Sequence, residues 1–148
     1  MAGRKAGGRM VDFVLAMILI GATFLAPAQI SWYDPALGGI NCDHDCGVVG
    51  ATTRFHESMY GNVLACPIEF PRGTKFTITS SRGGLANGTW TCLDGGGSAV
   101  LTDTAIRLDL MSDHPIWAET VMVRVEFPRW IVRESKFGLA EACVKDKC

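Results

Sequence analysis

Several short stretches of this chain alternate apolar and polar residues with a period of two. The alternation is clearest in residues 73–79, 105–110 and 121–127, and Pro128 ends the last of them. A period of two is typical of strands with one buried face, so we predict a strand in each stretch. Beyond residue 28 no long stretch has the 3.6-residue period of a helix, and we expect only a short helix over 134–142.

Turn signals separate these stretches. Asn87-Gly88 stands directly before the stretch 89–92 and predicts a hairpin, because Asn and Gly tolerate the positive φ of a tight turn. Residues 48–55 predict an additional first strand, whereas 29–46 have the composition of a loop. About five short strands joined by glycine-rich turns favour one small closed β-barrel.

The N-terminus has the three parts of a secretory signal. Arg4, Lys5 and Arg9 precede an apolar run over 13–25, and Ala26-Pro27-Ala28 follows it. A basic region, a short apolar region and an A-x-A site predict a signal peptide over 1–28, and therefore a secreted, extracytoplasmic protein. As a helix the apolar run would reach roughly 20 Å, short of a bilayer core of roughly 30 Å. The alternative is an uncleaved anchor, and we expect membrane contact only in that case.

Charge limits the partners of the remaining chain. Residues 1–28 hold three of the 14 basic and one of the 15 acidic residues, which leaves 11 basic and 14 acidic residues and a net charge of −3. A surface that tracks nucleic-acid phosphates needs clustered positive charge, so no nucleic acid is expected. The roughly 120 residues that remain suit a single domain, which we expect to be a monomer.

All six cysteines lie beyond residue 28. They are Cys42, Cys46, Cys66, Cys92, Cys143 and Cys148. An even number in an exported chain predicts disulfides, although six cysteines allow 15 connectivities. The stretch 42–46 also offers two thiols and a histidine, ligand types that zinc accepts. No second pair stands at the spacing of a zinc finger, so we favour a disulfide or polar loop there and predict no metal and no cofactor.

Four short motifs resemble one family. They are Ala65-Cys66-Pro67, Pro71-Arg72-Gly73-Thr74, Asp94-Gly95-Gly96-Gly97 and Arg107-Leu108-Asp109-Leu110. Their order and spacing resemble the 3D domain family, named for three aspartates. That family shares its barrel with membrane-bound lytic transglycosylase A and, more remotely, with rare lipoprotein A and expansins. The resemblance covers about 47–127, with Ala51-Thr52 similar to the opening strand of the family.

The resemblance implies the fold. It is all-β, a small six-stranded double-psi β-barrel over 47–130 with short helical and loop additions, stabilised by disulfides. Residues 29–46 would form an N-terminal loop segment, and 131–148 a tail closed by a short cysteine loop. Cys66 stands where the family has its first aspartate, near the Asp-Gly-Gly segment. The resemblance therefore implies a Cys66–Cys92 disulfide and leaves Cys42–Cys46 and Cys143–Cys148 as the remaining pairs.

The resemblance also implies a catalytic carboxyl group. Cleavage of a glycosidic bond needs an acid to protonate the leaving oxygen. Asp109 matches the catalytic position and Asp94 lies beside it, with Thr52, Gly96 and Trp117 as substrate-binding residues. Read from the residues alone, Asp94 is equally well a turn residue and Asp109 a carboxylate on the solvated face of a strand. Trp117 offers a face on which a sugar ring can stack, although core packing is the default for a tryptophan.

Three functions therefore remain. The first is an exported, cell-wall-acting protein that cleaves peptidoglycan as a lytic transglycosylase in a bacterial envelope. The second is a non-catalytic, expansin-like module that binds peptidoglycan or a related glycan, in which Cys66 marks the loss of a catalytic aspartate. The third is a purely structural protein of an envelope or of a particle. A thiol nucleophile made of Cys66 and His56 is disfavoured, because Cys66 has a better partner in Cys92.

Overall fold

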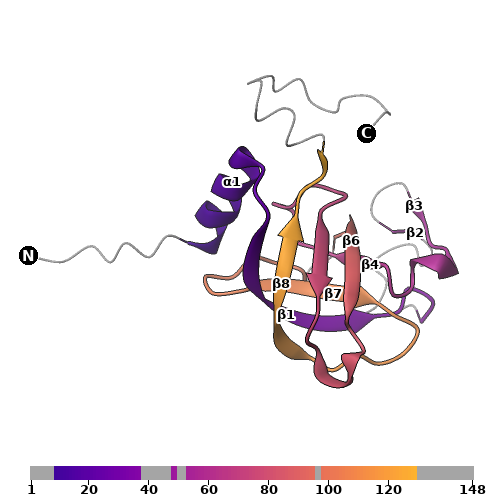
Figure 1. Cartoon of the computed structure of the whole chain (residues 1–148). Coiled ribbons are helices and arrows are strands. Elements are labelled where there is room, and N and C mark those ends of the chain that lie inside the picture. The colour runs from indigo at the N-terminus through magenta and orange to yellow at the C-terminus, as the bar shows by residue number, and fades with distance from the viewer. Residues whose placement is uncertain (1–8, 38–47, 50–52, 96–97, 130–148) are drawn as a thin grey trace, which may run out of the picture.

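The computed structural model describes residues 9–37, 48–49, 53–95 and 98–129, and within them six strands close into a barrel (Figure 1). These strands are β1 (Phe24–Tyr33), β4 (Val63–Ala65), β5 (Lys75–Ile78), β6 (Gly88–Asp94), β7 (Ile106–Met111) and β8 (Glu119–Glu126). A helix, α1 (Met10–Ile20), precedes the barrel. Two 3₁₀ turns cover Glu57–Met59 and Arg82–Gly84. The all-β class and the closed barrel are confirmed.

The strand order around the barrel is β1-β7-β4-β6-β5-β8. Two pairs are parallel, β1 with β7 and β4 with β6, and the other four are antiparallel. When β1 is exchanged with β6, β4 with β7 and β5 with β8, every strand pair maps onto a pair of the same direction. The two halves of the barrel are therefore topologically equivalent.

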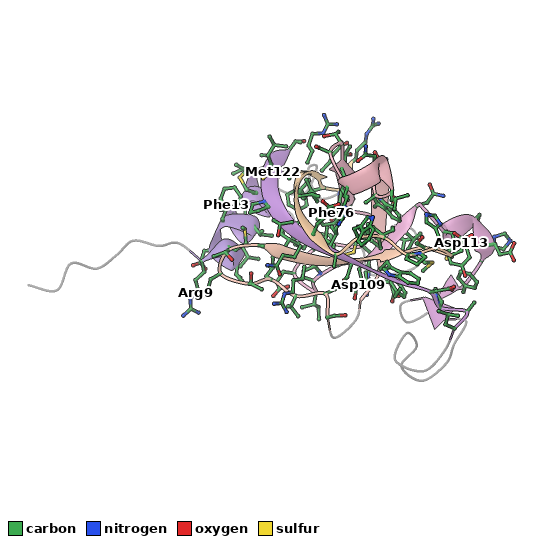
Figure 2. All side chains as sticks on the ribbon, turned by 90° about the horizontal axis from the view of Figure 1, so that it is seen from below. Arg9, Phe13, Phe76, Asp109, Asp113 and Met122 are labelled. Carbon is green, nitrogen blue, oxygen red and sulfur yellow. A yellow bond between two sulfur atoms is a disulfide. The ribbon has the colours of Figure 1, made fainter. Side chains whose placement is uncertain are left out.

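Alternation along the strands builds the core. Each strand turns one set of apolar side chains inward, as in β8, where Val121, Val123 and Val125 are buried and their neighbours are not. Phe76 is fully buried within the barrel (Figure 2). Trp90 is also buried, and its indole N–H donates to the carbonyl of Ala86 over 2.8 Å. The strands predicted in 73–79, 105–110 and 121–127 are thus confirmed as β5, β7 and β8.

The predicted hairpin at Asn87-Gly88 is wider than a two-residue turn. β5 and β6 pair antiparallel, but residues 79–87 connect them and include the 3₁₀ turn. The side-chain oxygen of Asn87 accepts from both the backbone N–H and the hydroxyl of Ser81, each over 2.9 Å. Asn87 therefore closes the longer loop with its side chain.

The barrel begins earlier than residue 47. β1 contains Ala26 and Ala28, both buried, and continues to Tyr33, where a loop was expected. The segment 48–55, expected to be the opening strand, instead holds β2 (Val48–Val49) and β3 (Thr53–Arg54), which pair with each other outside the barrel. The physical reason is that inward Phe24, Ala26, Ala28 and Ile30 have a strand period, which the apolar run before them conceals. Processing after Ala28 stays a prediction.

Helix α1 packs on one end of the barrel. Val14 is fully buried, and the ring of Phe13 meets Phe24 edge-on with centroids 5.2 Å apart. Gly21 ends the helix in the left-handed conformation, at φ 62°. Within the part of the chain that the structure describes, no helix is long and apolar enough to cross a membrane.

One disulfide joins the parallel strands β4 and β6. It links Cys66, directly after β4, to Cys92 in β6, with Cα atoms 5.7 Å apart. Both residues are buried, which confirms the pairing that the resemblance implied. Cys42, Cys46, Cys143 and Cys148 lie outside the described residues, as do the short helix expected over 134–142 and the tail over 131–148.

Candidate functional site

Four neighbouring strands bring the candidate site together on the outer face of the barrel. Ser31 on β1 is in register with Asp109 on β7, which is in register with Ala65 on β4. Ala65 in turn is in register with Asp94 on β6. The two aspartates thus flank one residue of β4 at the same level of the barrel. Their strands are two sheet spacings apart, roughly 10 Å.

Asp109 points away from the core. Its neighbours Leu108 and Leu110 are buried inside the barrel, whereas Asp109 is half-buried on the outer face. This confirms that the carboxylate interrupts an apolar strand without entering the core. In Figure 2 Asp109 lies away from Phe13 and α1, so the site and the helix occupy different parts of the barrel.

Two serine hydroxyls hold the Asp109 carboxylate. The hydroxyl of Ser31 donates to Oδ1, and the hydroxyl of Ser98 donates to Oδ2. Ser31 comes from β1, and Ser98 from the segment between β6 and β7. Both carboxylate oxygens are therefore fixed, by residues from different parts of the chain. Sequence reasoning missed both serines, although the alternation of Gln29, Ser31 and Tyr33 with buried residues of β1 is a signal for an outward face.

Tyr33 binds Asp94 and is close enough to Asp109 to respond to its charge. Its phenol donates to Oδ2 of Asp94 over 2.7 Å, and the backbone N–H of Gly95 donates to Oδ1 over 2.8 Å. Burial, then the charge and hydrogen bond of Asp94 and the charge of Asp109, raise the pKa of Tyr33 far above its usual value, against the opposing charge of Arg72. Tyr33 is thus kept as a neutral hydrogen-bond donor near both carboxylates.

Arg72 and the disulfide support the Asp94 side of the site. A Cβ atom added to Gly95 would lie 3.1 Å from Nη2 of Arg72, so glycine allows the guanidinium to approach the backbone closely. The backbone N–H of Cys66 donates to the carbonyl of Asp94 over 3.1 Å. Cys66 therefore anchors the strand that carries Asp94 both by this hydrogen bond and by its disulfide to Cys92.

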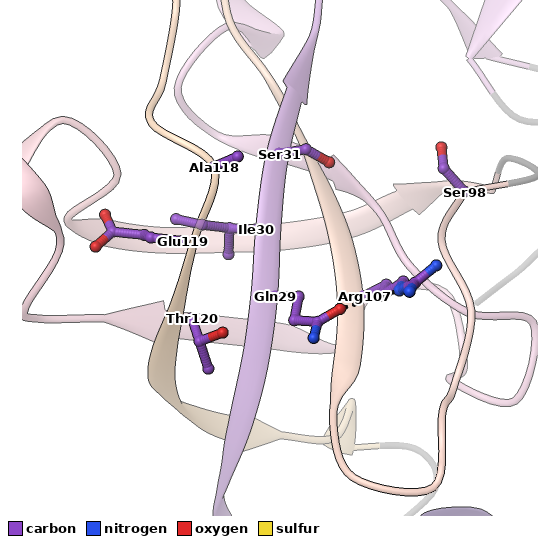
Figure 3. Close-up of a pocket in the computed structure, with 8 residues that line it drawn as sticks. All are labelled: Gln29, Ile30, Ser31, Ser98, Arg107, Ala118, Glu119 and Thr120. Atoms are coloured by element: carbon purple, nitrogen blue, oxygen red, sulfur yellow. Dashed lines mark hydrogen bonds between the residues drawn. The ribbon is translucent and has the colours of Figure 1, made fainter.

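A groove of about 410 Å³ lies beside Asp109. Its lining residues are Gln29, Ile30, Ser31, Ser98, Arg107, Ala118, Glu119 and Thr120. Figure 3 shows Gln29 and Ser31 along β1, Arg107 on β7 and Ser98 on the segment before β7. Ser31 and Ser98, the two residues that bind Asp109, therefore belong to the wall of the groove.

Trp117 stands directly before the groove residues Ala118 and Glu119. Its side chain is 52% exposed, so it is not a core residue. The Arg82 guanidinium carbon lies 3.9 Å from the ring centroid, and the Arg82 backbone N–H donates to Glu119 over 2.7 Å. One face of the indole is thus covered by a cation. The other two predicted substrate-binding residues, Thr52 and Gly96, lie outside the described residues.

Among the described residues no group of three or more His, Cys, Asp and Glu side chains gathers in a way that could hold a metal ion. His56 caps a 3₁₀ turn by accepting from the Ser58 backbone N–H, and His114 contacts the neighbouring Asp113. Neither histidine makes a hydrogen bond to the aspartates of the site among the contacts of the described residues.

The molecule is thus a closed six-stranded β-barrel with the carboxylates of Asp94 and Asp109, three hydroxyl groups and the guanidinium groups of Arg72 and Arg107 near one another. In comparisons with known proteins no family model, no curated protein and no solved structure matches the chain.

Proposed function

We propose that this protein is an exported peptidoglycan lytic transglycosylase-like enzyme that uses Asp109 as its acid and base. One observation carries the proposal. The hydroxyl groups of Ser31 and Ser98, two residues that line an open groove, hold the carboxylate of Asp109, and a second carboxylate, Asp94, lies across β4 with the neutral phenol of Tyr33 bonded to it. A half-buried carboxyl group held in one orientation next to a groove is placed for proton transfer to a substrate bound there.

The strand order supports a double-psi barrel of the 3D type. In such a barrel two equivalent strand units interlock. Here the exchange of β1, β4 and β5 with β6, β7 and β8 reproduces every pairing, including both parallel pairs. Asp94 and Asp109 lie on the two strands that neighbour β4 in this order, β6 and β7.

The chemistry needs one carboxyl group for two steps. Asp109 first donates its proton to the glycosidic oxygen as the bond from that oxygen to C1 breaks. The oxygen of the sugar's own 6-hydroxyl then bonds to C1, and its proton passes to the Asp109 carboxylate. The carboxyl group is regenerated and the product is a 1,6-anhydro sugar. No water and no cofactor is consumed.

Tyr33 and Asp94 serve this chemistry without transferring the proton. A phenol with a strongly raised pKa is a poor acid at neutral pH, so Tyr33 acts as a donor that orients Asp94. The positive charge that develops on the sugar ring during bond cleavage is favoured by a second nearby carboxylate. Asp94 is thus a positioning and electrostatic residue.

The disulfide supports the extracytoplasmic part of the proposal. Disulfides persist in oxidising compartments and are rare in the cytosol. Cys66 and Cys92 are both buried and linked to each other, and Cys92 is on the strand that carries Asp94. A protein acting on the cell wall outside the cytoplasm meets those conditions.

Product analysis tests the proposal. Purified peptidoglycan is incubated with the wild-type chain and, as the matched blank, with Asp109→Asn, and the soluble products are analysed by mass spectrometry. We expect 1,6-anhydro products from the wild type only. Products with a free reducing end would instead indicate hydrolysis, and equal product from Asp109→Asn would exclude Asp109 as the acid.

A binding module without turnover is the second candidate, and Trp117, which is exposed and directly precedes the groove residue Ala118 in the chain, favours it. This function predicts that wild type pulls down peptidoglycan but releases no product. Binding should then survive Asp109→Asn and Asp94→Asn and weaken on Trp117→Ala. Release of 1,6-anhydro products by the wild type excludes this candidate.

A further inference from the structure

Arg107 projects into the groove beside Asp109. It lies two positions before Asp109 on β7, so both side chains are on the outer face, about 7 Å apart along the strand. Its neighbours Ile106 and Leu108 are buried, whereas Arg107 is exposed and lines the groove. Figure 3 shows its side chain beside Gln29 of the neighbouring strand. An arginine thus flanks the proposed catalytic group.

The guanidinium is oriented but not neutralised. Its Nε donates to Oε1 of Gln29 over 3.0 Å, across the parallel pair in which Gln29 and Arg107 are in register. Among the described residues, ion pairs form between His114 and Asp113 and between Arg124 and Glu126, and Arg107 forms none. Gln29 therefore fixes one edge of the guanidinium and leaves the terminal nitrogens without a carboxylate partner in that part of the chain.

A fixed planar guanidinium in a groove matches one ligand chemistry. Its paired N–H groups fit a carboxylate with two parallel hydrogen bonds, stronger than those between neutral groups. In peptidoglycan, carboxyl chemistry is found on the lactyl ether of the muramic sugar and on the peptide attached to it. The lactyl group is on the same ring as the bond that a lytic transglycosylase cleaves.

We propose that Arg107, oriented by Gln29, binds a carboxylate on the muramic side of the glycan and selects acidic over neutral strands. This inference rests on the proposed function for the identity of the glycan. Arg107 would be a specificity residue, because it contacts a carboxylate of the substrate and not the atoms of the glycosidic bond that breaks. The carboxylate comes from the lactyl ether in peptide-free strands or from the peptide in peptide-bearing strands.

Equilibrium binding tests the inference independently of turnover. Three probes are titrated into the full chain: a neutral N-acetylglucosamine oligomer, peptide-free strands with lactyl carboxylates, and peptide-bearing strands in which the lactyl group is an amide. The variants are Arg107→Gln, which removes the charge, and Arg107→Lys, which keeps the charge and removes the fork. Arg124→Gln is the matched control, since Arg124 is an exposed arginine on β8 paired with Glu126 and outside the groove.

We expect Arg107→Gln to weaken binding of a carboxylate-bearing probe by about 10- to 100-fold and to leave the neutral oligomer unchanged. Arg107→Lys should recover only part of the loss, and Arg124→Gln should lose nothing. Loss with peptide-free strands assigns the contact to the lactyl carboxylate, whereas loss only with peptide-bearing strands assigns it to the peptide. An unchanged preference in Arg107→Gln, or an equal loss for the neutral oligomer, overturns the inference.

The two proposals fail separately in these experiments. A wild type that releases 1,6-anhydro products while Arg107→Gln keeps its preference for acidic strands overturns the role of Arg107 alone. A wild type that binds acidic strands through Arg107 and releases no product overturns the catalytic role of Asp109 alone. An unchanged unfolding midpoint in Arg107→Gln shows that any loss of binding is local.

Discussion

The two halves of β1 differ in the strand they mainly pair with and in the residues they carry on the outer face. Residues 24–28 pair antiparallel with β8 and turn Phe24, Ala26 and Ala28 into the core. Residues 29–33 pair parallel with β7 and carry Gln29, Ser31 and Tyr33 on the outer face. The first half supplies most of the pairing with β8 that closes the barrel, and the second half, of which Gln29 and Ile30 also pair with β8, carries the residues of the site.

One strand therefore contributes separately to closure of the barrel and to the candidate site. The boundary between the halves falls between Ala28 and Gln29, where the sequence predicts processing. Cleavage there would remove five of the seven β1 residues that pair with β8 and keep Gln29, Ser31 and Tyr33, which contact the site. The contacts of Gln29, Ser31 and Tyr33 to β6 and β7 do not involve residues 24–28.

The largest expected effect is a loss of turnover on substitution of Asp109, which Ser31 of the second half of β1 binds. Asp109→Asn keeps the shape of the side chain and removes the transferable proton. We expect turnover to fall by about 10²- to 10⁴-fold, because positioned proton transfer typically contributes that much. The unfolding midpoint should remain within the range of a surface substitution. Turnover like that of the wild type in Asp109→Asn ends the catalytic assignment.

The next largest effect is on stability and concerns Phe24, in the first half of β1. In the unprocessed chain, Phe24→Ala removes a buried ring that contacts Phe13 and Phe127, with centroids 5.2 and 5.8 Å away. We expect the free energy of unfolding to fall by about 3–5 kcal/mol, with turnover unchanged while the protein is folded. Leu25→Ala is the matched control, because Leu25 is 66% exposed and should change little.

N-terminal sequencing of the exported protein decides which form these measurements describe. A first residue of Gln29 means that Phe24→Ala has no effect on the processed protein. An intact Met1 end in the membrane fraction excludes processing after Ala28. In that form a Phe24→Ala chain as stable as the wild type would contradict the closing role of the first half.

Removal of the disulfide is expected to lower the stability of the barrel more than it disturbs the site residues on the second half of β1. The Cys66–Cys92 bond closes a loop with a sequence separation of 26. Replacing both residues with serine should lower the free energy of unfolding by roughly 3–4 kcal/mol in the loop-entropy model. Denaturant titration measures it. An unchanged denaturation midpoint would exclude a stabilising role for this bond.

The smallest effect is a titration that reports on Tyr33. The chain has two tyrosines, and desolvation with the hydrogen bond to Asp34 raises the pKa of Tyr60 to about 12. Tyr60→Phe leaves Tyr33 as the only tyrosine, and its ionisation is followed by ultraviolet absorbance. We expect no ionisation in the folded protein near 10.0, the ordinary tyrosine pKa, and earlier ionisation in Asp94→Asn.

The sign of the linked stability follows from the raised pKa. The folded state favours the neutral phenol, so the contribution of Tyr33 is complete below about pH 10 and is lost as the unfolded chain ionises above it. Tyr33→Phe should therefore be less sensitive than the wild type to alkaline pH. Half-ionisation of Tyr33 near 10.0 in the folded protein would contradict the Tyr33–Asp94 contact.

Much of the barrel could be predicted because its strands have one polar face. β5, β7 and β8 alternate clearly, and the outward position of Asp109 followed from its buried neighbours. β1 was missed because Leu25 and Pro27 on its outer face are also apolar, so the period of two is hidden within an apolar run. The outward position of Asp109 could thus be predicted, whereas the two serines that bind its carboxylate could not.

Ser31 and Ser98 could not be found from local sequence. A serine in a loop or strand carries no spacing signal, and each becomes informative only when the closed barrel brings it to Asp109. The opening strand was placed at 48–55 because its valines and threonines suit a strand, yet those residues pair outside the barrel. Local preference identified strand-forming residues and not their partners.

The Ser31–Asp109 hydrogen bond has a consequence for the order of folding. It joins residues 78 positions apart, through a parallel pair that no tight turn can nucleate. Closing so long a loop is entropically costly, and non-local pairing of this kind forms slowly. The proposed acid is therefore fully positioned only when the first and fifth barrel strands meet, so activity would return during refolding no earlier than the pairing of β1 with β7.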